Sequence, residues 1–228
     1  MARNYDWTKV GQSLDTEGTA VLPRLIEPEQ CAQLAADYSR EDIYRSRIVM
    51  ARHGFGRGEY KYFGYPLPRL VQTLRENLYP RLAPIANRWN QAMHIGVQYP
   101  ATLAGFLRRC HRAGQKRPTP LILQYATDDY NCLHQDLYGE HVFPLQATVL
   151  LSRPGIDFEG GEFVVTDAGT KEKRAAVVPL SQGDAVVFAV NRRPAMGRRG
   201  SKTAMRHGVS RVRKGLRHTV GIIFHDAR

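Results

Sequence analysis

Apolar positions in the first half of the chain recur with the spacing of amphipathic helices. Residues 68–93 carry large apolar side chains on one side, so we predict a helix there, which Pro80 and Pro84 break or kink. A short helix is predicted over residues 6–15. Another begins at Glu27-Pro28-Glu29, because proline and acidic side chains suit the first turn of a helix.

Three further segments complete the first half. Residues 18–23 are typical of a strand that runs into a turn, and residues 108–117 are strongly basic. Residues 52–65 are rich in glycine and aromatic side chains, and we predict an ordered loop there rather than a regular element. The pattern therefore predicts that residues 1–120 form a helical layer with one or two strands.

From residue 121 the pattern changes to short apolar runs separated by turn residues such as Gly160-Gly161 and Gly183-Asp184. Eight strands without intervening helices indicate a two-sheet barrel of the jelly-roll, cupin-like type. The predicted strands cover residues 121–126, 134–138, 143–152, 162–166, 176–180, 185–190, 204–212 and 217–224.

The expected fold class is thus α+β, with residues 1–228 forming one domain. The helical layer of residues 1–120 buttresses a β core of residues 121–228. Residues 191–203 are the segment that we expect to be mobile, because glycine, proline and arginine leave it little to bury.

Composition narrows the class of protein. A chain of 228 residues is long enough for one well-buried domain. No run approaches the roughly 18 apolar residues that span a bilayer, and the first residues lack the apolar core of a signal peptide. Cys31, Cys110 and Cys132 are odd in number and lack metal-ligand spacing, which favours a reducing compartment. We therefore expect a cytoplasmic protein that is not membrane-bound, and no feature marks a dimer interface.

The charge is high and unevenly placed. The net charge is +12 and the isoelectric point is about 9.9. No acidic residue occurs between Asp184 and Asp226. Such a cluster attracts polyanions, although a solvated basic surface without a partner is an equally good explanation from charge alone. The candidate phosphate-binding residues are Arg192, Arg193, Arg198, Arg199 and Lys202.

The most informative motif is His134-Gln135-Asp136 with His207 about 70 residues further on. Side chains two apart on a strand share a face, so His134 and Asp136 can reach one metal ion, and His207 can approach it from another strand. Two imidazoles and one carboxylate on one face of iron form the facial triad of non-haem Fe(II) oxygenases. An isolated H-x-D is a weak signal, but the distal segment Met205–Ser210 strengthens it.

Arg217 lies ten residues after His207, ahead of the apolar run 218–224. An arginine on a buried strand needs an anionic partner. A 2-oxoglutarate co-substrate bound to iron by its keto-acid end would present such a carboxylate, which a guanidinium binds through two hydrogen bonds. Tyr125 could donate its hydroxyl group to the same co-substrate, or it could simply be a core aromatic.

These residues carry a family resemblance. The order Tyr125, His134-Gln135-Asp136, Gly160-Gly161-Glu162-Phe163, Gly183-Asp184, His207 and Arg217 resembles the Fe(II)/2-oxoglutarate dioxygenases with their double-stranded β-helix. Residues 206–213 and 221–226 resemble a bacterial group described as oxygenases acting on damaged nucleic acid. The ten-residue spacing from His207 to Arg217 is, however, closer to the prolyl-hydroxylase type than to the DNA-dealkylase type.

The resemblance implies that His134, Asp136 and His207 hold Fe(II) and that Arg217 anchors 2-oxoglutarate, with dioxygen as the second co-substrate. If the substrate is an N-alkylated base, the hydroxylated alkyl carbon leaves as an aldehyde, and the base must come from a single strand or be flipped out. The aromatics of residues 55–65 could stack on bases.

Three functions follow as hypotheses. The first is a nucleic-acid dealkylase, which the basic residues around the iron site favour. The second is a protein side-chain hydroxylase of the prolyl type, which the spacing of His207 and Arg217 favours. The third is a non-catalytic nucleic-acid-binding domain in which the H-x-D is incidental, and it predicts that no iron is bound.

Overall fold

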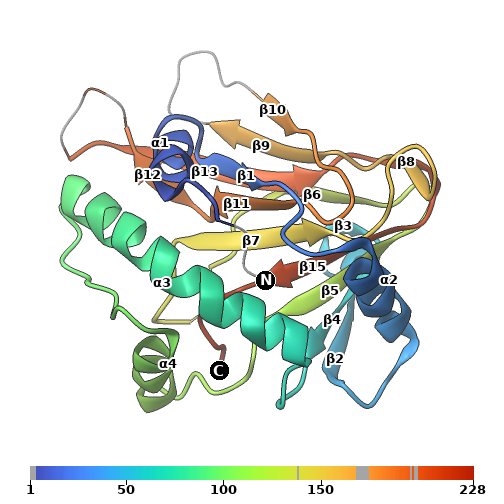
Figure 1. Ribbon diagram of the computed structural model, residues 1–228, viewed down its shortest axis with the longest axis horizontal. Coiled ribbons are helices and arrows are strands. Elements are labelled where there is room, and N and C mark those ends of the chain that lie inside the picture. Colours follow the sequence, from blue (N-terminus) through green and yellow to red (C-terminus); the bar gives the residue numbers. More distant parts are fainter. Residues whose placement is uncertain (1–3, 138, 168–174, 196, 198–199) are drawn as a thin grey trace.

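The computed structural model describes residues 4–137, 139–167, 175–195, 197 and 200–228. Helices pack on one side of a pair of β-sheets (Figure 1). The helices are α1 (Trp7–Glu17), α2 (Pro28–Ala36), α3 (Arg69–Ala92) and α4 (Leu103–Arg112), with 3-10 turns η1 (Asp37–Ser39) and η2 (Met50–His53). No helix in this described part combines the length and the apolar character that crossing a membrane requires.

Capping residues explain where the first helix begins and ends. Asp6 accepts hydrogen bonds from the backbone amides of Thr8 and Lys9, both at 3.1 Å, which satisfies amides that have no partner within the helix. Gly18 ends α1 in the left-handed conformation, with a φ of 72°. The helix extends two residues past the predicted end at residue 15.

Helix α3 is continuous over 24 residues although Pro80 and Pro84 lie inside it. Of the predicted break or kink, the break is excluded, because α3 continues through both prolines. Each interior proline costs about 3 kcal/mol. The apolar face of α3 contains eight buried large side chains (Val71, Leu74, Leu78, Tyr79, Leu82, Ile85, Trp89 and, just past the end, Met93), and each contributes roughly 1.5–3 kcal/mol. Burial therefore outweighs the loss of two backbone hydrogen bonds.

The larger sheet has seven strands, and in every pairing the neighbours are antiparallel. Its order is β1 (Thr19–Leu22), β11 (Ala185–Ala189), β7 (Leu145–Leu150), β15 (Arg217–Ile222), β5 (Leu121–Tyr125), β4 (Glu59–Phe63) and β2 (Tyr44–Val49). We call it the major sheet.

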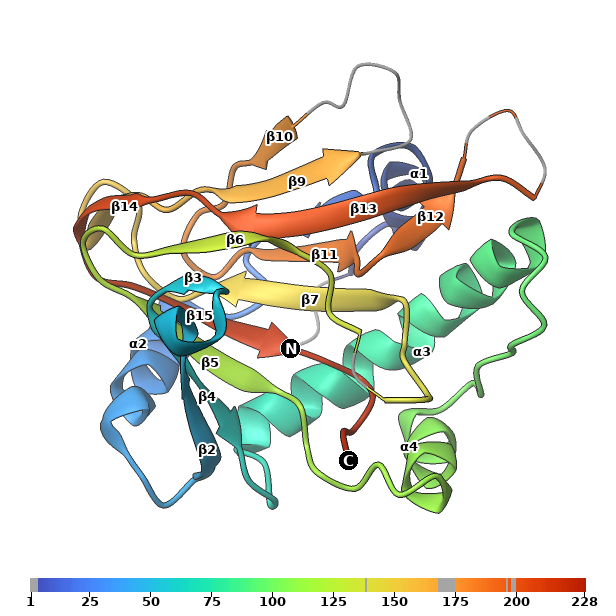
Figure 2. The same cartoon turned by 180° about the vertical axis from the view of Figure 1, so that it is seen from behind.

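The smaller sheet faces it (Figure 2). Its order is β10 (Ala175–Val178), β9 (Phe163–Asp167), β13 (Lys202–Val209), β6 (Tyr130–His134) and β3 (Gly56–Arg57), with β12 (Arg192–Pro194) paired to β13. We call it the minor sheet. A third pair, β8 (Phe158–Gly160) and β14 (Val212–Gly215), closes one end. The architecture is the double-stranded β-helix, and the predicted fold class is confirmed.

The first half contributes more strands than its pattern predicts. Four strands, β1 to β4, come from residues before 120, where one or two were expected. The segment 52–65 is not a loop, because it contains β3 and β4. Strand β4 pairs with both β2 and β5, so its aromatic residues extend the major sheet. The strand pattern is hard to see in the sequence because glycine occupies positions where the fold leaves no room for a side chain. At Gly56, which has a φ of 122°, a Cβ would lie 2.4 Å from the Tyr130 carbonyl oxygen.

In the second half, six predicted strands agree with β5, β7, β9, β10, β11 and β15 to within two residues at each end. The strand predicted over 134–138 is wrong, because β6 runs from Tyr130 to His134 and ends there. The strand predicted over 204–212 is two strands, β13 and β14. Residues 192–194, inside the segment expected to be mobile, form β12.

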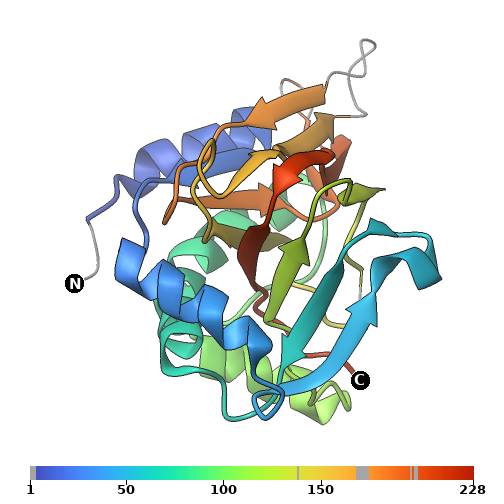
Figure 3. The ribbon, with the colours of Figure 1, turned by 90° about the vertical axis from the view of Figure 1, so that its right-hand side faces the viewer.

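Helices α1, α2 and α3 cover the outer face of the major sheet (Figure 3). Most buried hydrophobic side chains of the helices and of both sheets belong to one continuous cluster, and Met50, Tyr125, Leu150, Phe158 and Val212 form a second one. Trp89 of α3, Ile122 of β5 and Phe163 of β9 are all members of the first cluster. Between the two sheets a cavity remains that is lined by residues of both.

Candidate functional site

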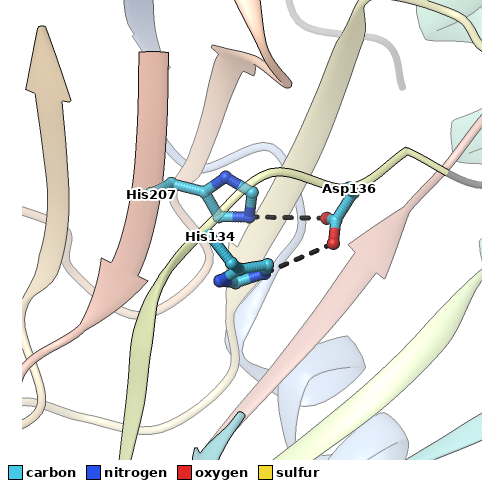
Figure 4. Close-up of side chains that lie close together, drawn as sticks. All are labelled: His134, Asp136 and His207. Atoms are coloured by element: carbon cyan, nitrogen blue, oxygen red, sulfur yellow. Dashed lines mark ion pairs between the residues drawn. The ribbon is translucent and has the colours of Figure 1, made fainter. Parts of the chain in front are cut away.

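Strands β6 and β13 bring two histidines together. His134 is the last residue of β6 and pairs directly with His207 of β13, so that their ring centroids are 4.3 Å apart. Asp136 follows β6 and turns back toward both rings (Figure 4). Its carboxylate oxygens lie 3.3 Å from Nε2 of His134 and 3.4 Å from Nε2 of His207.

Gln135 explains how Asp136 reaches this position outside a strand. The Gln135 side-chain amide donates hydrogen bonds to the carbonyl oxygens of Asn191, at 2.9 Å, and Met205, at 2.8 Å. These bonds hold the chain after β6 against β13. The expected proximity of His134 and Asp136 is therefore found, but its cause is this side-chain attachment and not the alternation of a strand.

The three side chains fit a metal ion. Their ligand atoms lie within 4.8 Å of one another. Metal–nitrogen and metal–oxygen bonds near 2.1 Å place neighbouring ligand atoms of an octahedral ion about 3 Å apart. Nδ1 of His134 lies 2.8 Å from the Cys132 carbonyl oxygen, which fixes the proton on Nδ1 and leaves the Nε2 lone pair facing Asp136. Two imidazoles with one carboxylate are the donor set of a non-haem iron centre.

Burial and charge shift the pKa values of the three groups. Burial opposes the charge of His134, but the hydrogen bond and charge of Asp136 outweigh burial and raise the pKa of His134. Burial opposes the charge of Asp136, but hydrogen bonds and charge from His134 and His207 outweigh it and hold the pKa of its carboxyl group well below the usual range. Burial lowers the pKa of His207, and the opposing effect of Asp136 is smaller. A charged carboxylate beside a neutral imidazole is the state that binds a metal cation.

Arg217 lies on the major sheet opposite this group. It is the first residue of β15, it is 2% exposed, and it pairs across the sheet with Tyr125 of β5. Among the described residues, Nε and Nη1 of Arg217 have no hydrogen-bond partner. Burial lowers the pKa of its guanidinium to about 10, while the nearby Tyr125 and Glu162 oppose the shift, so the group remains charged at neutral pH. A buried cation with unpaired hydrogen-bond donors can bind an anion.

Tyr125 is fully buried beneath this guanidinium, whose central carbon lies 5.6 Å from the tyrosine ring centroid. Its hydroxyl group accepts a hydrogen bond from the Asn131 amide at 3.4 Å. Burial raises the pKa of the phenol, which therefore stays protonated and can donate a hydrogen bond.

A cavity of about 240 Å³ joins the two groups, because His134, Asp136, His207, Tyr125 and Arg217 all line it. Several lining residues were missed by the sequence analysis, although a pattern could have found some of them. Strand β7 is apolar except for Gln146 and Thr148, which share one face and line the cavity, as does Thr219 two residues after Arg217. Phe188 was also missed, whereas Tyr60 and Tyr62 belong to the aromatics of residues 55–65 and Phe163 to the Gly160–Phe163 motif, which the sequence analysis had named.

A turn at Gly160-Gly161-Glu162 supports Arg217 from the other side. Gly161 has a φ of 62°, and a Cβ there would lie 2.8 Å from Cδ of Arg217. Glu162 and Ser210 bind each other reciprocally: each backbone amide donates at 3.0 Å, and the Ser210 hydroxyl also donates to the Glu162 carboxylate. The turn is thereby attached to the chain that follows His207.

The predicted phosphate-binding residues that the structure describes do not all lie on one exposed surface. Arg192 and Lys202 are exposed on β12 and β13. Arg193 is 6% exposed and donates to the Asp167 carboxylate at 2.5 Å and to the Asp15 carbonyl oxygen at 3.1 Å. Its ion pair with the partly buried Asp167 speaks against the predicted role as a phosphate contact. Arg198 and Arg199 lie outside the described residues.

Comparison with known proteins identifies a family whose model matches most of this chain. A family model described as an oxygenase "catalysing oxidative methylation of damaged DNA" matches residues 58–227. Two uncharacterized proteins of Mycobacterium tuberculosis, MT2286 (strain CDC 1551 / Oshkosh) and Rv2227 (strain ATCC 25618 / H37Rv), are each 44% identical over 167 residues, which is 72% of this chain and 72% of each relative.

Solved structures share the fold. A prolyl-4-hydroxylase from Pseudomonas putida superposes with a TM-score of 0.58 at 15% identity, covering 97% of this chain and 99% of that one. A 2OG-Fe(II) oxygenase family oxidoreductase from Burkholderia pseudomallei has a TM-score of 0.57 at 17% identity, covering 100% of this chain and 97% of that one. At such identities the likeness concerns the fold alone.

Proposed function

We propose that this chain, which belongs to the Oxygenase-NA family within the 2-oxoglutarate- and Fe(II)-dependent oxygenases, removes alkyl groups from damaged nucleic-acid bases by oxidation. The observation that carries the proposal is that one cavity is lined both by the His134, Asp136 and His207 group and by a buried arginine with unpaired donors. The hypothesis of a non-catalytic domain with an incidental H-x-D is set aside, because the three residues converge and the family is one of oxygenases.

Different residues would bind the metal ion and the co-substrate. His134, Asp136 and His207 would hold Fe(II). Arg217 would bind the distal carboxylate of 2-oxoglutarate through two parallel N–H donors, and the protonated hydroxyl group of Tyr125 would donate a further hydrogen bond to it. Phe163 and Phe188, which pack against His207, exclude water from the metal side of the cavity.

Bound Fe(II) supplies the oxidation of a C–H bond, in which 2-oxoglutarate and dioxygen become succinate and carbon dioxide and one oxygen atom enters the substrate. On an N-methyl group the product is an N-hydroxymethyl group, which leaves as formaldehyde and returns the proton to the base nitrogen. Oxidation of a methyl group therefore removes it, and we interpret the family's described activity on damaged DNA as repair of this kind.

Charge supports a nucleic-acid substrate. The net charge of +12 favours a polyanion, and Arg192 and Lys202 keep exposed positive charges on the minor-sheet side of the molecule. A base inside a duplex cannot enter a cavity between two sheets, so the substrate is a single strand or a flipped nucleotide.

The test is succinate formation by the anaerobically Fe(II)-loaded protein after air is admitted, with and without a methylated single-stranded DNA oligonucleotide. We expect succinate that rises with the oligonucleotide, together with formaldehyde. His134→Ala should abolish both products, whereas His94→Ala, which changes an exposed histidine outside the cavity, should not. An absence of both succinate and bound iron in the wild-type protein would refute the assignment.

A protein side-chain hydroxylase of the prolyl type is the second candidate. The ten-residue spacing from His207 to Arg217 favours it, and so does the likeness in fold to the Pseudomonas putida prolyl-4-hydroxylase. In that case the basic surface would face an acidic protein partner. Succinate that depends on His134 but is indifferent to nucleic acid, and that rises with an acidic proline-containing peptide, would favour this candidate over the first.

A further inference from the structure

An exposed aromatic pair stands at the mouth of the cavity. Phe55, between η2 and β3, lines the cavity that holds the metal-binding group, yet 42% of its surface is exposed. Its ring stacks on that of His53, with centroids 5.5 Å apart and planes inclined by 21°. Neither ring is part of the core cluster. The pair thus presents a flat apolar face beside the opening and does not pack inside the protein.

The backbone holds this pair in register with a metal-binding residue. The Phe55 amide donates to the Met50 carbonyl oxygen at 3.2 Å, and the Phe55 carbonyl oxygen accepts from the Cys132 amide at 2.9 Å. The Cys132 carbonyl oxygen in turn binds Nδ1 of His134. Gly56 pairs with Asn131, so β3 adds an edge to the strand that carries His134 (Figure 2). The backbone of Phe55 is therefore fixed relative to His134.

Arginines precede and follow the pair along the chain, at residues 52 and 57. Arg52 and Arg57 are exposed, and within the described part of the chain no carboxylate lies within ion-pair distance of Arg52. Arg57 has one distant partner, Asp129, at 3.7 Å. A flat aromatic face between two cations matches a nucleobase between two phosphates, because bases stack on aromatic rings while phosphates bind arginine.

We propose that His53 and Phe55 form a stacking platform for the nucleobase next to the damaged one on a single strand. This inference rests on the proposed function and adds the position of the neighbouring nucleotide. The damaged base enters the cavity, its neighbour lies on the Phe55 ring, and Arg52 and Arg57 bind the phosphates on either side. Stacking is tolerant of sequence, so the platform accepts any neighbouring base.

The test uses short single-stranded DNA oligonucleotides that carry one 1-methyladenine. In one, a fluorescent 2-aminopurine lies beside the lesion, and in a second an abasic site replaces that neighbour. Binding to the anaerobic, Fe(II)-loaded full chain is measured by titration. With the wild-type protein we expect quenching of the 2-aminopurine, and about tenfold weaker binding of the abasic oligonucleotide.

Three variants distinguish a role of Phe55 in base stacking from a role in the fold alone. Phe55→Ala should bind the intact oligonucleotide about tenfold more weakly, should not quench 2-aminopurine, and should no longer distinguish the abasic oligonucleotide. Phe55→Trp should retain all three properties, because indole also stacks. Val97→Ala is the matched control, since Val97 is 47% exposed and does not line the cavity.

Three outcomes would overturn the platform. If Phe55→Ala binds and quenches like the wild type, or still discriminates against the abasic oligonucleotide, the neighbouring base lies elsewhere and the platform alone is refuted. If the wild-type protein makes succinate but binds no oligonucleotide, the nucleic-acid function fails and the platform fails with it. A lower thermal midpoint of Phe55→Ala with unchanged binding would identify Phe55 as structural and also refute the platform.

Discussion

Arg193 and Arg217 come from the same basic stretch and are both buried, yet they lie in different surroundings. Arg193 fills a gap between β12 and the end of α1, where both terminal nitrogens of its guanidinium donate to oxygen atoms of Asp15, Asp167 and Pro194. Arg217 lines the cavity between the sheets, where Nε and Nη1 find no partner in the described chain. A buried arginine with a carboxylate stabilises the fold, whereas one without a partner is available to a ligand.

The strongest test of this comparison is Arg217→Met. The variant keeps much of the apolar volume and removes the donors, so we expect the Kd for 2-oxoglutarate to rise about 100-fold, because each hydrogen bond to a charged group contributes about 1.5–3 kcal/mol. Isothermal titration of the anaerobic, Fe(II)-loaded protein measures this. An unchanged Kd would show that the co-substrate carboxylate binds elsewhere.

The pH dependence sharpens the same prediction. Because the pKa of Arg217 is lowered to about 10 and binding needs the cation, 2-oxoglutarate affinity should be flat from about pH 7 to 9 and fall as the pH approaches that value. In Arg217→Lys the fall should begin at lower pH, since lysine starts from a lower pKa and meets the same burial. Identical pH profiles for the two proteins would contradict this explanation.

Arg193→Met should have the opposite effect to Arg217→Met, because it should lower the stability of the fold and leave 2-oxoglutarate binding unchanged. Removing the guanidinium leaves Asp167 without this partner and frees two carbonyl oxygens, so we expect the free energy of unfolding to fall by about 2 kcal/mol. Urea denaturation measures the loss. The Kd for 2-oxoglutarate should stay at the wild-type value, and a large change in it would remove the distinction between the two arginines.

Gly161→Ala tests the contact that supports Arg217. A Cβ at residue 161 would lie 2.8 Å from Cδ of Arg217 and 2.9 Å from Cγ2 of Val212, so the guanidinium must shift. We expect about tenfold weaker 2-oxoglutarate binding. Gly155→Ala is the matched control, because Gly155 has a φ of 76° and a Cβ there meets nothing within 4 Å. Equal losses of affinity in the two variants would mean that backbone strain alone is responsible.

The smallest expected effect concerns the exposed basic residues. The double change Arg192→Ala and Lys202→Ala should weaken binding of a single-stranded oligonucleotide severalfold at low salt, equally for all sequences. It should lower the salt-dependence slope by about 1.4 if each residue neutralises one phosphate. Arg193→Met should leave the slope unchanged. A slope that is the same in the double variant and the wild type would exclude these two residues from the nucleic-acid contact.

Much of the fold follows from local pattern. Strands β5, β7, β9, β10, β11 and β15 are short apolar runs between turn residues, and α1 and α2 begin at residues that suit a helix start. Strands β2 to β4 did not follow, because β3 pairs with β6 and β4 pairs with β5, both from the other half of the chain, while β2 in turn pairs with β4. Propensity alone does not report such pairing.

The candidate site residues also fall into those that the sequence predicted and those that it did not. The grouping of His134, Asp136 and His207 was expected from spacing and family resemblance, and the structure brings their ligand atoms within 4.8 Å of one another. The Glu162–Ser210 attachment was missed because it depends on which segments face each other, whereas the polar face of β7 was missed although the spacing of Gln146 and Thr148 indicates it.

The sequence by itself determined the chemical types available: two imidazoles and a carboxylate at a metal-binding spacing, an arginine ahead of an apolar strand, and a large excess of positive charge. Those properties belong to side chains and their order, so they can be recognised before folding. Only the tertiary structure decided which buried arginine is neutralised by a carboxylate and which is left for a ligand. The free energy of a buried charge depends on the groups around it, and those groups come from distant parts of the chain.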